Sequence, residues 1–392
     1  MIARLEIDLG AIRANAAAIA AFVAPAQFGA VVKANAYGHG IVEVARALDG
    51  AVDRFCVYEA GEAVALREGG IRAPILVMGP VPPGDLDVAH ACGAEITLWD
   101  TEAYARRVAS IARRRDAPFR VHVKVETGVS RMGLAPARAA GAVEQYLSTP
   151  ELRVAGLYSH LAAAEELDSD FTLIQLERFV EALLPCAPAL ARVEPRPQRH
   201  IAASAAALLW PQTRLDLVRV GIALYGLWPS PETRARLGNA IALRPALRWT
   251  SELVEVREVA AETSVGYGRT YRTPAATRIG VLPIGYAEGI PRAVSNRGSV
   301  LVGGKRCQIV GRVCMNMTMI DVGAVPSAAP GTEVTLIGSD GASSIGAEEW
   351  GAWAETIDYE IVARLPREIP RAYDRRYLPR AEIAAARSIV PS

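Results

Sequence analysis

Lysine is scarce in this chain, and one lysine stands where a strand is expected to end. Of the 43 basic residues, 40 are arginines and three are lysines, namely Lys33, Lys124 and Lys305. Arginine cannot replace lysine where chemistry needs a neutral amine, because the guanidinium pKa exceeds about 12. Lys33 follows the apolar run 30–32, so it is a candidate for covalent chemistry with a carbonyl compound. The plain alternative is a lysine whose ammonium reaches solvent, and we interpret Lys305, in a glycine-rich hairpin, as such a surface residue.

Short β-branched runs alternate with helical stretches over the first 225 residues. The runs lie at 30–32, 55–57, 75–77, 96–98, 121–125, 154–158, the segment ending at 200–201, and 217–220. Apolar residues with helical spacing mark stretches such as 101–115 and 171–184 between them. Eight strands with intervening helices predict an α/β protein that begins with a (β/α)8 TIM barrel. A doubly wound sheet is the alternative, but no GxGxxG motif follows a strand.

Beyond about residue 236, alternating strand patterns replace this texture. They cover 250–259, 278–283, 299–302, 307–313, 318–322 and 332–337, with one helix near 346–354. We therefore expect the barrel at 11–236 and a mostly β C-terminal domain at 237–392. Residues 1–10 contain an alternating strand that could join the C-terminal domain.

Composition and charge argue against several classes of protein. The 43 basic and 42 acidic residues give a net charge of +1, which disfavours nucleic-acid binding. Five scattered cysteines without a CxxC pair indicate neither a disulfide framework nor a zinc site, and we expect no bound metal. The apolar stretches are too broken for a membrane span, and the N-terminus lacks the basic run of a secretory signal. We expect a cytoplasmic protein that binds neither membranes nor nucleic acid.

Recognisable motifs follow several predicted strands. They are KANAYGHG from Lys33, KVETGVSRMG from Lys124, and YSHL, which contains His160. These segments resemble the pyridoxal-phosphate lysine motif, the K-x-(D/E)-T-G-x-x-R-x-G segment and the T-H-F segment of alanine racemases. The resemblance extends over nearly the whole chain. It implies that Lys33 holds pyridoxal 5'-phosphate covalently, that Tyr37 contacts the phosphate, and that His160 stacks on the cofactor ring. It also implies that Arg131 binds the substrate carboxylate.

The loops after strands seven and eight, where barrels commonly bind phosphate, contain further matching positions. Ser204, followed by alanines, is a plausible helix N-cap, although Ala203 stands where the family usually has asparagine. The resemblance implies cofactor contacts at four positions and a supporting place for the strand-end His200. The four positions are Ser204, Gly221, Ile222 and Tyr359.

Arg219, in strand eight, carries mechanistic information. Many pyridoxal enzymes place a carboxylate against the ring nitrogen, which keeps the nitrogen protonated and makes the ring a strong electron sink. Arginine cannot accept that proton, so the ring nitrogen should stay neutral and the sink should be weaker. A weaker sink suits racemisation better than transamination or elimination. The plain alternative for Arg219 is an ion pair with Asp216.

The C-terminal domain supplies other motif residues. SVGYGRTY, which contains Tyr267, resembles the family's S-Y-G-x-T-Y loop and implies that Tyr267 is a second catalytic base. GRVCMN resembles G-R-V-(C/S)-M-D and implies a substrate-carboxylate contact at Met315, with Asn316 in place of the usual aspartate. IGYAEGIPR resembles the substrate-access segment, in which Tyr286 lines the way in and Arg292 ends the motif.

The resemblance implies interconversion of L- and D-alanine, with D-alanine supplied for cell-wall peptidoglycan. Inverting a stereocentre in place requires one base on each face. The resemblance assigns the D face to Lys33 and the L face to Tyr267, which would come from the partner in a head-to-tail homodimer. The alternatives are a racemase of broader specificity (serine, lysine), a barrel-type decarboxylase that uses Cys314, and a non-catalytic pyridoxal-binding barrel. The last would lack the C-terminal domain.

Lys124 lies seven residues before Arg131, where the family often carries a carbamylated lysine. Two cations in a partly desolvated site repel each other, whereas a carbamate would pair with Arg131. The alternative is a plain Lys124–Glu126 salt bridge, because strand alternation puts both side chains on the same side.

Overall fold

The computed structural model describes residues 3–99 and 102–374, and the chain divides into two compact units. Among the described residues, the barrel unit comprises 11–36, 41–99 and 102–244, and the sheet unit comprises 3–10, 37–40 and 245–374. Tyr37 therefore belongs to the sheet unit, although it follows Lys33 of the barrel unit by four residues. Within the described residues, no helix is both long and apolar enough to cross a membrane.

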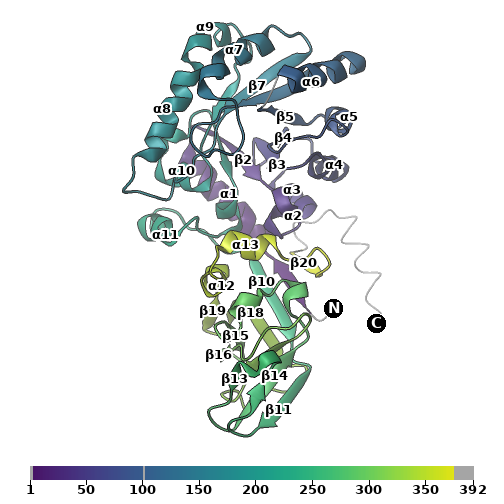
Figure 1. Ribbon diagram of the computed structural model, residues 1–392, viewed down its shortest axis with the longest axis vertical. Helices are drawn as coiled ribbons and strands as arrows, with labels where there is room; N and C mark the ends of the chain where they lie inside the picture. Colours follow the sequence, from purple (N-terminus) through teal and green to yellow (C-terminus); the bar gives the residue numbers. More distant parts are fainter. Residues whose placement is uncertain (1–2, 100–101, 375–392) are drawn as a thin grey trace. The chain divides into compact units, whose positions relative to one another are not determined.

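Eight parallel strands form the barrel unit (Figure 1). They are β2 (Gln27–Val31), β3 (Arg54–Val57), β4 (Ile75–Val77), β5 (Glu95–Leu98), β6 (Phe119–Lys124), β7 (Leu152–Tyr158), β8 (Gln198–His200) and β9 (Leu217–Val220). They pair in the order β8-β7-β6-β5-β4-β3-β2-β9. Between β8 and β9, the N–H of Asp216 bonds the Arg199 carbonyl, so the barrel is nearly closed. The predicted TIM barrel is confirmed, and all eight predicted strands are present.

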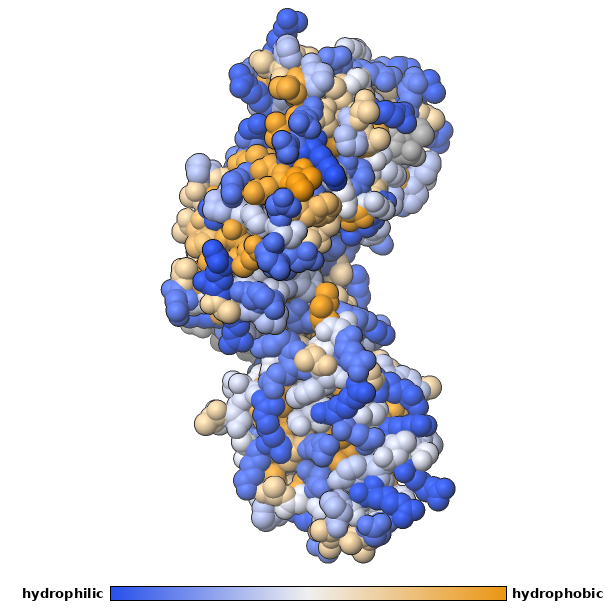
Figure 2. Space-filling model, turned by 60° about the vertical axis from the view of Figure 1, so that its left-hand side comes forward, coloured by the Kyte–Doolittle hydropathy of each residue, from blue (hydrophilic) through white to orange (hydrophobic). Residues whose placement is uncertain are grey.

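Helices connect the barrel strands and cover their outer face. They are α1 (Leu9–Val23), α3 (Ile41–Leu48), α4 (Ala60–Glu68), α5 (Leu86–Ala91), α6 (Glu102–Arg115), α7 (Pro136–Leu147), α8 (Phe171–Leu183), α9 (Ala187–Leu190), α10 (Ser204–Leu209) and α11 (Pro231–Leu237). Helix α3 buries Ile41, Val44, Ala45 and Leu48, the spacing of one helical face. Figure 2 brings forward the left-hand side of Figure 1, on which α8 lies, and shows hydrophobic patches on the barrel unit. Helix α8 itself exposes Leu173 and Val180.

Barrel strands β3, β4, β5 and β9 are buried at every position, as expected for parallel strands covered on both faces. Alternate residues of a barrel strand point inward, and barrels usually fill that space with branched aliphatic side chains. Here several interior positions are polar. Buried polar side chains on the strands include Arg54, Glu95, His122 and Arg219.

The sheet unit contains a seven-stranded sheet, a three-stranded sheet and a short hairpin. The large sheet comprises β1 (Arg4–Ile7), β10 (Leu247–Glu252), β15 (Ser299–Val302), β16 (Lys305–Gln308), β18 (Glu333–Asp340), β19 (Ser343–Ile345) and β20 (Arg371–Tyr373). The small sheet comprises β11 (Glu255–Val259), β14 (Thr277–Leu282) and β17 (Thr318–Asp321), and the hairpin comprises β12 (Ser264–Val265) and β13 (Tyr271–Arg272). Strand β1 pairs antiparallel with β10 and parallel with β20. Helices α12 (Ala347–Ala354) and α13 (Asp358–Ala363) follow the large sheet in sequence.

Two strand predictions in this unit were wrong in extent. The predicted strand 250–259 is two strands, because the chain leaves the large sheet after Glu252 and enters the small sheet at Glu255. The predicted strand 307–313 ends at Gln308, and Gly311 then takes a φ of +77°, outside strand geometry. The predicted hairpin at Lys305 is present, with Gly303 and Gly304 at positive φ between β15 and β16.

Candidate active site

The barrel unit gathers several predicted site residues at the carboxyl ends of its strands. Lys33 follows β2, Lys124 ends β6, and His160 follows β7, while Ser204 follows β8 and Arg219 lies in β9. Their charges interact, since Lys33, Arg131, Arg219 and Lys124 each act on the pKa of His160. Because all barrel strands run in parallel, these ends share the rim on which barrel enzymes build their active sites.

Lys33 is half-buried, and its amine is biased towards the neutral form. Burial lowers the pKa of Lys33, the positive charge of Arg131 lowers it further, and Glu62 partly opposes the change. A neutral amine is the nucleophilic form of lysine. The residue type, the place and the lowered pKa fit a lysine that bonds an aldehyde carbon.

Lys33 starts an unusual stretch of backbone. Residues 34–37 all have φ between +52° and +55°, so α2 (Lys33–Tyr37) is a left-handed turn built without glycine. Such a conformation costs L-residues roughly 1–2 kcal/mol each. Side chains hold it in place, because the Ala34 N–H donates to Glu62 Oε1 at 2.6 Å and Asn35 Oδ1 accepts from the Ile41 N–H at 3.1 Å. Strain of this kind concentrates at functional sites.

Lys124 is buried among positive charges. Burial lowers its pKa to about 8, and Arg131, Arg219 and Lys33 contribute to the decrease, opposed by Glu126. The Glu126 carboxylate serves its own loop, accepting from the N–H groups of residues 128, 129 and 131 at 2.6, 2.6 and 3.2 Å. This arrangement weakens the case for a plain Lys124–Glu126 salt bridge.

Arg219 is held by neutral acceptors. Its Nη1 donates to His200 Nδ1 at 2.7 Å, and its Nη2 donates to the Ser159 carbonyl at 2.9 Å. Asp216, the alternative partner considered from the sequence, instead pairs with Arg199 at 3.0 Å. The ion-pair alternative for Arg219 was therefore wrong. His160 Nδ1 lies 3.4 Å from Arg219 Nη2, and burial together with Arg219 lowers the pKa of His160 to about 3.

Ser204 connects the loops after β8 and β9. The expectation that Ser204 caps α10 was wrong, because Ala203 occupies the cap position and Ser204 is the first helical residue. Its hydroxyl instead accepts from the Gly221 N–H at 3.0 Å, just before Ile222. Because this hydroxyl accepts from Gly221, its own proton can donate to a phosphate, and the next backbone amide, of Ile222, lies beside it in sequence.

The sheet unit holds the two predicted phosphate tyrosines together. The ring centroids of Tyr37 and Tyr359 are 6.2 Å apart. Gly38, which follows Tyr37 in sequence, packs against α13 so closely that a Cβ would lie 2.2 Å from the Val362 carbonyl oxygen. Only glycine permits this approach, at a φ of +82°.

The remaining predicted residues form an exposed group on the sheet unit. Tyr267 is 72% exposed and Met315 is 57% exposed, while Tyr286 and Arg292 are also at the surface. Gly285 lets the turn at Tyr286 lie directly against the loop of Met315, since a Cβ at Gly285 would lie 2.5 Å from the Met315 carbonyl oxygen. Exposure of this kind suits residues that act on another subunit, where they would be covered.

Asn316 has a structural partner that accounts for its departure from aspartate. Its Nδ2 donates to Glu288 Oε1 at 2.8 Å, and Glu288 Oε2 accepts from the Gly285 N–H at 2.7 Å. An aspartate at 316 would place two carboxylates side by side. The amide therefore ties the Met315 loop to the Tyr286 turn.

Sequence reasoning missed the polar interior of the barrel, below the rim. Glu95, His122 and Arg54 are buried and connected to His200 by hydrogen bonds. The available signal was His122, two residues before Lys124 and therefore on the same side of the same strand.

Comparison with known proteins identifies the family. The "Alanine racemase, N-terminal domain" family matches residues 7–229, and the "Alanine racemase, C-terminal domain" family matches residues 246–373. The alanine racemase of Symbiobacterium thermophilum is 40% identical over 370 residues, covering 94% of this chain and 96% of that protein. The alanine racemase of Thermobifida fusca is also 40% identical, covering 95% and 98%.

Solved structures agree with the sequence relatives. The alanine racemase of Streptomyces lavendulae, a D-cycloserine producer, matches with a TM-score of 0.89 at 36% identity, covering 95% of this chain and 97% of that chain. The Bacillus anthracis alanine racemase with bound L-Ala-P matches with a TM-score of 0.87 at 34% identity, covering 96% of each chain. The chain therefore belongs to the alanine racemase family, a family of isomerases.

Proposed function

We propose that the protein interconverts L- and D-alanine with pyridoxal 5'-phosphate, on which the alanine racemase family depends. The observation that carries the proposal is Arg219, a donor-only side chain fixed by neutral acceptors on the same barrel rim as Lys33. A cation there leaves a ring nitrogen unprotonated, which favours return of a proton to the carbon that lost it. The resulting D-alanine would serve peptidoglycan synthesis in the cytoplasm.

The residues present fit the cofactor. Lys33 would hold it covalently, and His160 would stack on its ring. In the barrel unit the phosphate would lie against Ser204 and the amides of Gly221 and Ile222, and the family resemblance also assigns phosphate contacts to Tyr37 and Tyr359. When bound, pyridoxal phosphate withdraws electrons from an attached amino acid and so acidifies its Cα–H bond.

Two side chains would exchange the Cα proton. Lys33 serves the D face with its amine, and Tyr267 serves the L face with its phenol oxygen, one removing a proton while the other delivers one. A phenol with an ordinary pKa near 10 is a weak base at neutral pH, so a neighbour has to draw off its proton. The family resemblance assigns this role to His160. Burial and the charge of Arg219 lower the pKa of His160 to about 3, so its neutral ring can accept a hydrogen bond from the phenol but is too weak a base to hold the proton.

Tyr267 and Met315 would act on the partner subunit of a head-to-tail homodimer. Their exposure on the sheet unit supports this arrangement, since a catalytic phenol has to be shielded from water to exchange protons selectively. Tyr286 and Arg292 would line the access route to the completed site.

Arg131 would receive the substrate carboxylate. Lys124, with its pKa lowered to about 8, is neutral in roughly a tenth of the molecules at pH 7, and this neutral amine can add CO2, forming an N–C bond and releasing one proton. The resulting carbamate is an anion that would pair with Arg131 and hold it in place.

The proposal is tested by loading the protein with pyridoxal phosphate and incubating it with L-alanine, L-serine or L-lysine. We expect the D-isomer of alanine as the main product and no CO2. D-serine or D-lysine at comparable rates would replace the alanine assignment with a racemase of broader specificity. Release of CO2 would indicate a decarboxylase. The matched control is Lys33→Ala, which should form no product.

A further inference from the structure

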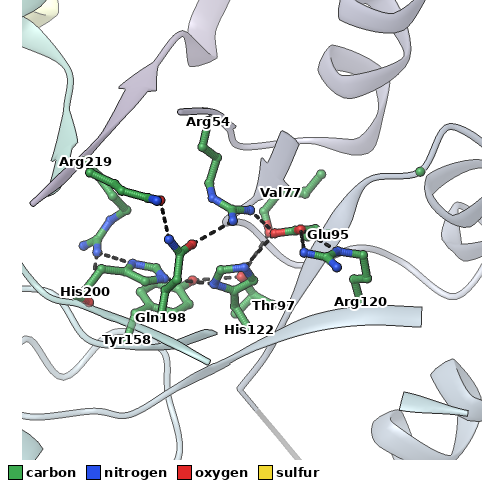
Figure 3. Close-up of polar contacts among 12 residues, drawn as sticks. Arg54, Val77, Glu95, Thr97, Arg120, His122, Tyr158, Gln198, His200 and Arg219 are labelled. Carbon is green, nitrogen blue, oxygen red and sulfur yellow. Dashed lines mark hydrogen bonds and ion pairs between the residues drawn. The ribbon is translucent and has the colours of Figure 1, made fainter. Parts of the chain in front are cut away.

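A chain of hydrogen bonds crosses the barrel interior, from Arg219 near the rim to Glu95 at the amino end of β5 (Figure 3). His200 and His122 lie between them, and all four side chains are buried. Stability alone does not explain such a network, because well-packed apolar residues in place of buried ion pairs are often equally or more stabilising. We therefore ask what the direction of its hydrogen bonds does for Arg219.

The proton positions along this chain are determined by its two ends. A guanidinium has donors only, so His200 Nδ1, 2.7 Å from Arg219 Nη1, has to accept. His200 then carries its proton on Nε2, and this N–H donates to His122 Nδ1 at 2.9 Å. The proton of His122 is likewise on Nε2 and donates to Glu95 Oε2 at 2.7 Å.

Both imidazoles are neutral in this arrangement. Burial lowers the pKa of His122 and of His200 well below the usual value, and the charge of Arg219 lowers both further. A doubly protonated His200 would place an N–H against the Arg219 guanidinium. The chain of hydrogen bonds therefore runs from the Arg219 cation to the Glu95 anion through two neutral imidazoles. Every N–H in it donates in the direction of Glu95.

The barrel makes specific room for His122. A Cβ at Gly156 would lie 2.2 Å from His122 Nδ1, so the facing residue has to be glycine. The β6–β7 pairing also shifts register at this point, since Val121 pairs with Val154 whereas His122 pairs with Gly156. His200 is packed as well, because the Tyr158 ring stacks on it at a centroid distance of 4.8 Å.

Glu95 is fixed at the far end by two arginines. Arg54 Nη1 bonds the same oxygen that accepts from His122, and Arg120 Nε donates to the other oxygen at 2.7 Å. Arg54 is buried, whereas the Arg120 side chain is half-exposed. The carboxylate therefore cannot rotate away from His122 without losing both guanidinium contacts.

We infer that Glu95 is a positioning residue for Arg219, acting through His122 and His200. This inference rests on the proposed function, in which Arg219 faces the ring nitrogen of the cofactor. Each protein acceptor around Arg219 among the described residues faces Nη1 or Nη2, so the Nε–H would be available to that nitrogen when the cofactor is bound. By keeping His200 Nδ1 an acceptor, Glu95 keeps the guanidinium in this orientation.

Each variant either interrupts the hydrogen bonds that run from Arg219 to Glu95 or keeps every donor and acceptor in its place. Glu95→Gln removes the charge and one acceptor, and His122→Leu interrupts the chain. His122→Gln preserves it, because its amide donates to Glu95 while its carbonyl accepts from His200. Arg120→Gln is the matched control, because Arg120 bonds only the other carboxylate oxygen, and Arg54 still holds the oxygen that accepts from His122.

The first readout needs no cofactor. The protein has only five histidines, so nitrogen NMR with isotope-labelled histidine can resolve the tautomer of each imidazole. We expect His122 and His200 to be protonated at Nε2 alone in the wild type and in Arg120→Gln. Glu95→Gln should mix the tautomers of His122. A wild-type His200 protonated at Nδ1 overturns the inference, whatever the protein catalyses.

The second readout uses protein loaded with pyridoxal phosphate. Glu95→Gln and His122→Leu should lower kcat by about tenfold or more, the loss expected for one charge-assisted hydrogen bond, and should shift the visible absorbance of the cofactor. The KM for alanine should change by less than about threefold, and His122→Gln should restore most of kcat. Should Glu95→Gln fail to fold, the two His122 variants decide.

Equal kinetics and spectra for Glu95→Gln and Arg120→Gln, or no difference between the two His122 variants, would overturn the inference. Absence of cofactor binding or racemisation in the wild type would instead overturn the proposed function. In that case the tautomers still decide whether the chain of hydrogen bonds exists.

Discussion

Replacing Lys124 with methionine should stabilise the cofactor-free protein at neutral pH. The lysine is only 6% exposed, and its ammonium is near the charges of Arg131, Arg219 and Lys33. Methionine has a similar length and flexibility without the charge, so it can fill the same space. The substitution removes the electrostatic penalty while leaving the packing largely intact.

The size of the penalty follows from the pKa of Lys124. Burial lowers this pKa from 10.5 to about 8. Between these pH values the unfolded chain binds more protons than the native protein, so the free energy of unfolding rises as the pH increases from 8 to 10.5. Below pH 8 the full penalty of about 3 kcal/mol is present, at ~1.4 kcal/mol per pKa unit. The lost cation–π contact with Tyr158 offsets about 0.5–1 kcal/mol.

We therefore expect Lys124→Met to raise the free energy of unfolding by about 2 kcal/mol at pH 7 in buffer free of CO2. Urea unfolding measures this change, and Lys305→Met is the control, because Lys305 is exposed. The difference between Lys124→Met and wild type should shrink as the pH approaches 10.5. A variant that is less stable than wild type at pH 7 would refute the electrostatic reasoning.

Bicarbonate gives the second arm of this experiment. A carbamate forms only on the native protein, so it should stabilise the wild type according to the ratio of CO2 concentration to its dissociation constant. Lys124→Met should not respond, and matched chloride provides the ionic-strength control. An equal response of both proteins to bicarbonate would show that Lys124 is not the site of CO2 addition.

Other substitutions test the catalytic roles. Lys33→Ala should abolish both racemisation and the borohydride-reducible cofactor adduct, and a reducible adduct in the variant would contradict the role of Lys33. Tyr267→Phe should keep cofactor binding but lose roughly 100-fold or more of its turnover, the range for removing a general base, with residual Cα-proton exchange biased towards D-alanine. Equal loss of exchange from both enantiomers would count against two bases. Mixing Lys33→Ala and Tyr267→Phe subunits should restore activity, because one of the two sites in a mixed dimer is then intact. Verified mixed dimers without activity would place each site within one chain.

The barrel, and the position of the candidate residues on its rim, could be predicted from the sequence because their signals are local. Short β-branched runs located the strands, and the residues after them, such as Lys33 and His160, share the rim of any parallel barrel. The break within the predicted strand 250–259 could not be predicted in this way. It occurs where the chain passes from one sheet to another, and the residues of the strand do not specify that change. The left-handed turn after Lys33 runs against the preference of alanine and tyrosine, so no local pattern indicates it.

Contacts between residues that are far apart in the sequence could not be predicted, for a different reason. Glu95 and His122 meet only because β5 and β6 pair in one register, and His122 meets His200 only through the room left by Gly156. The Asn316–Glu288 hydrogen bond likewise joins two loops 28 residues apart. Such pairs follow from closure of the fold and not from the spacing of residues along a single element.

The most direct test of the proposed activity is racemisation measured from both directions in deuterated water. Protein loaded with pyridoxal phosphate is incubated with L-alanine and, separately, with D-alanine, and the enantiomers and their Cα deuterium are quantified by chromatography and mass spectrometry. The proposed activity predicts that both reactions reach equal amounts of the two enantiomers, because these have equal free energies in water, and that the product enantiomer carries solvent deuterium. Retention of a single enantiomer from either direction, or pyruvate or CO2 as the main product, would contradict it.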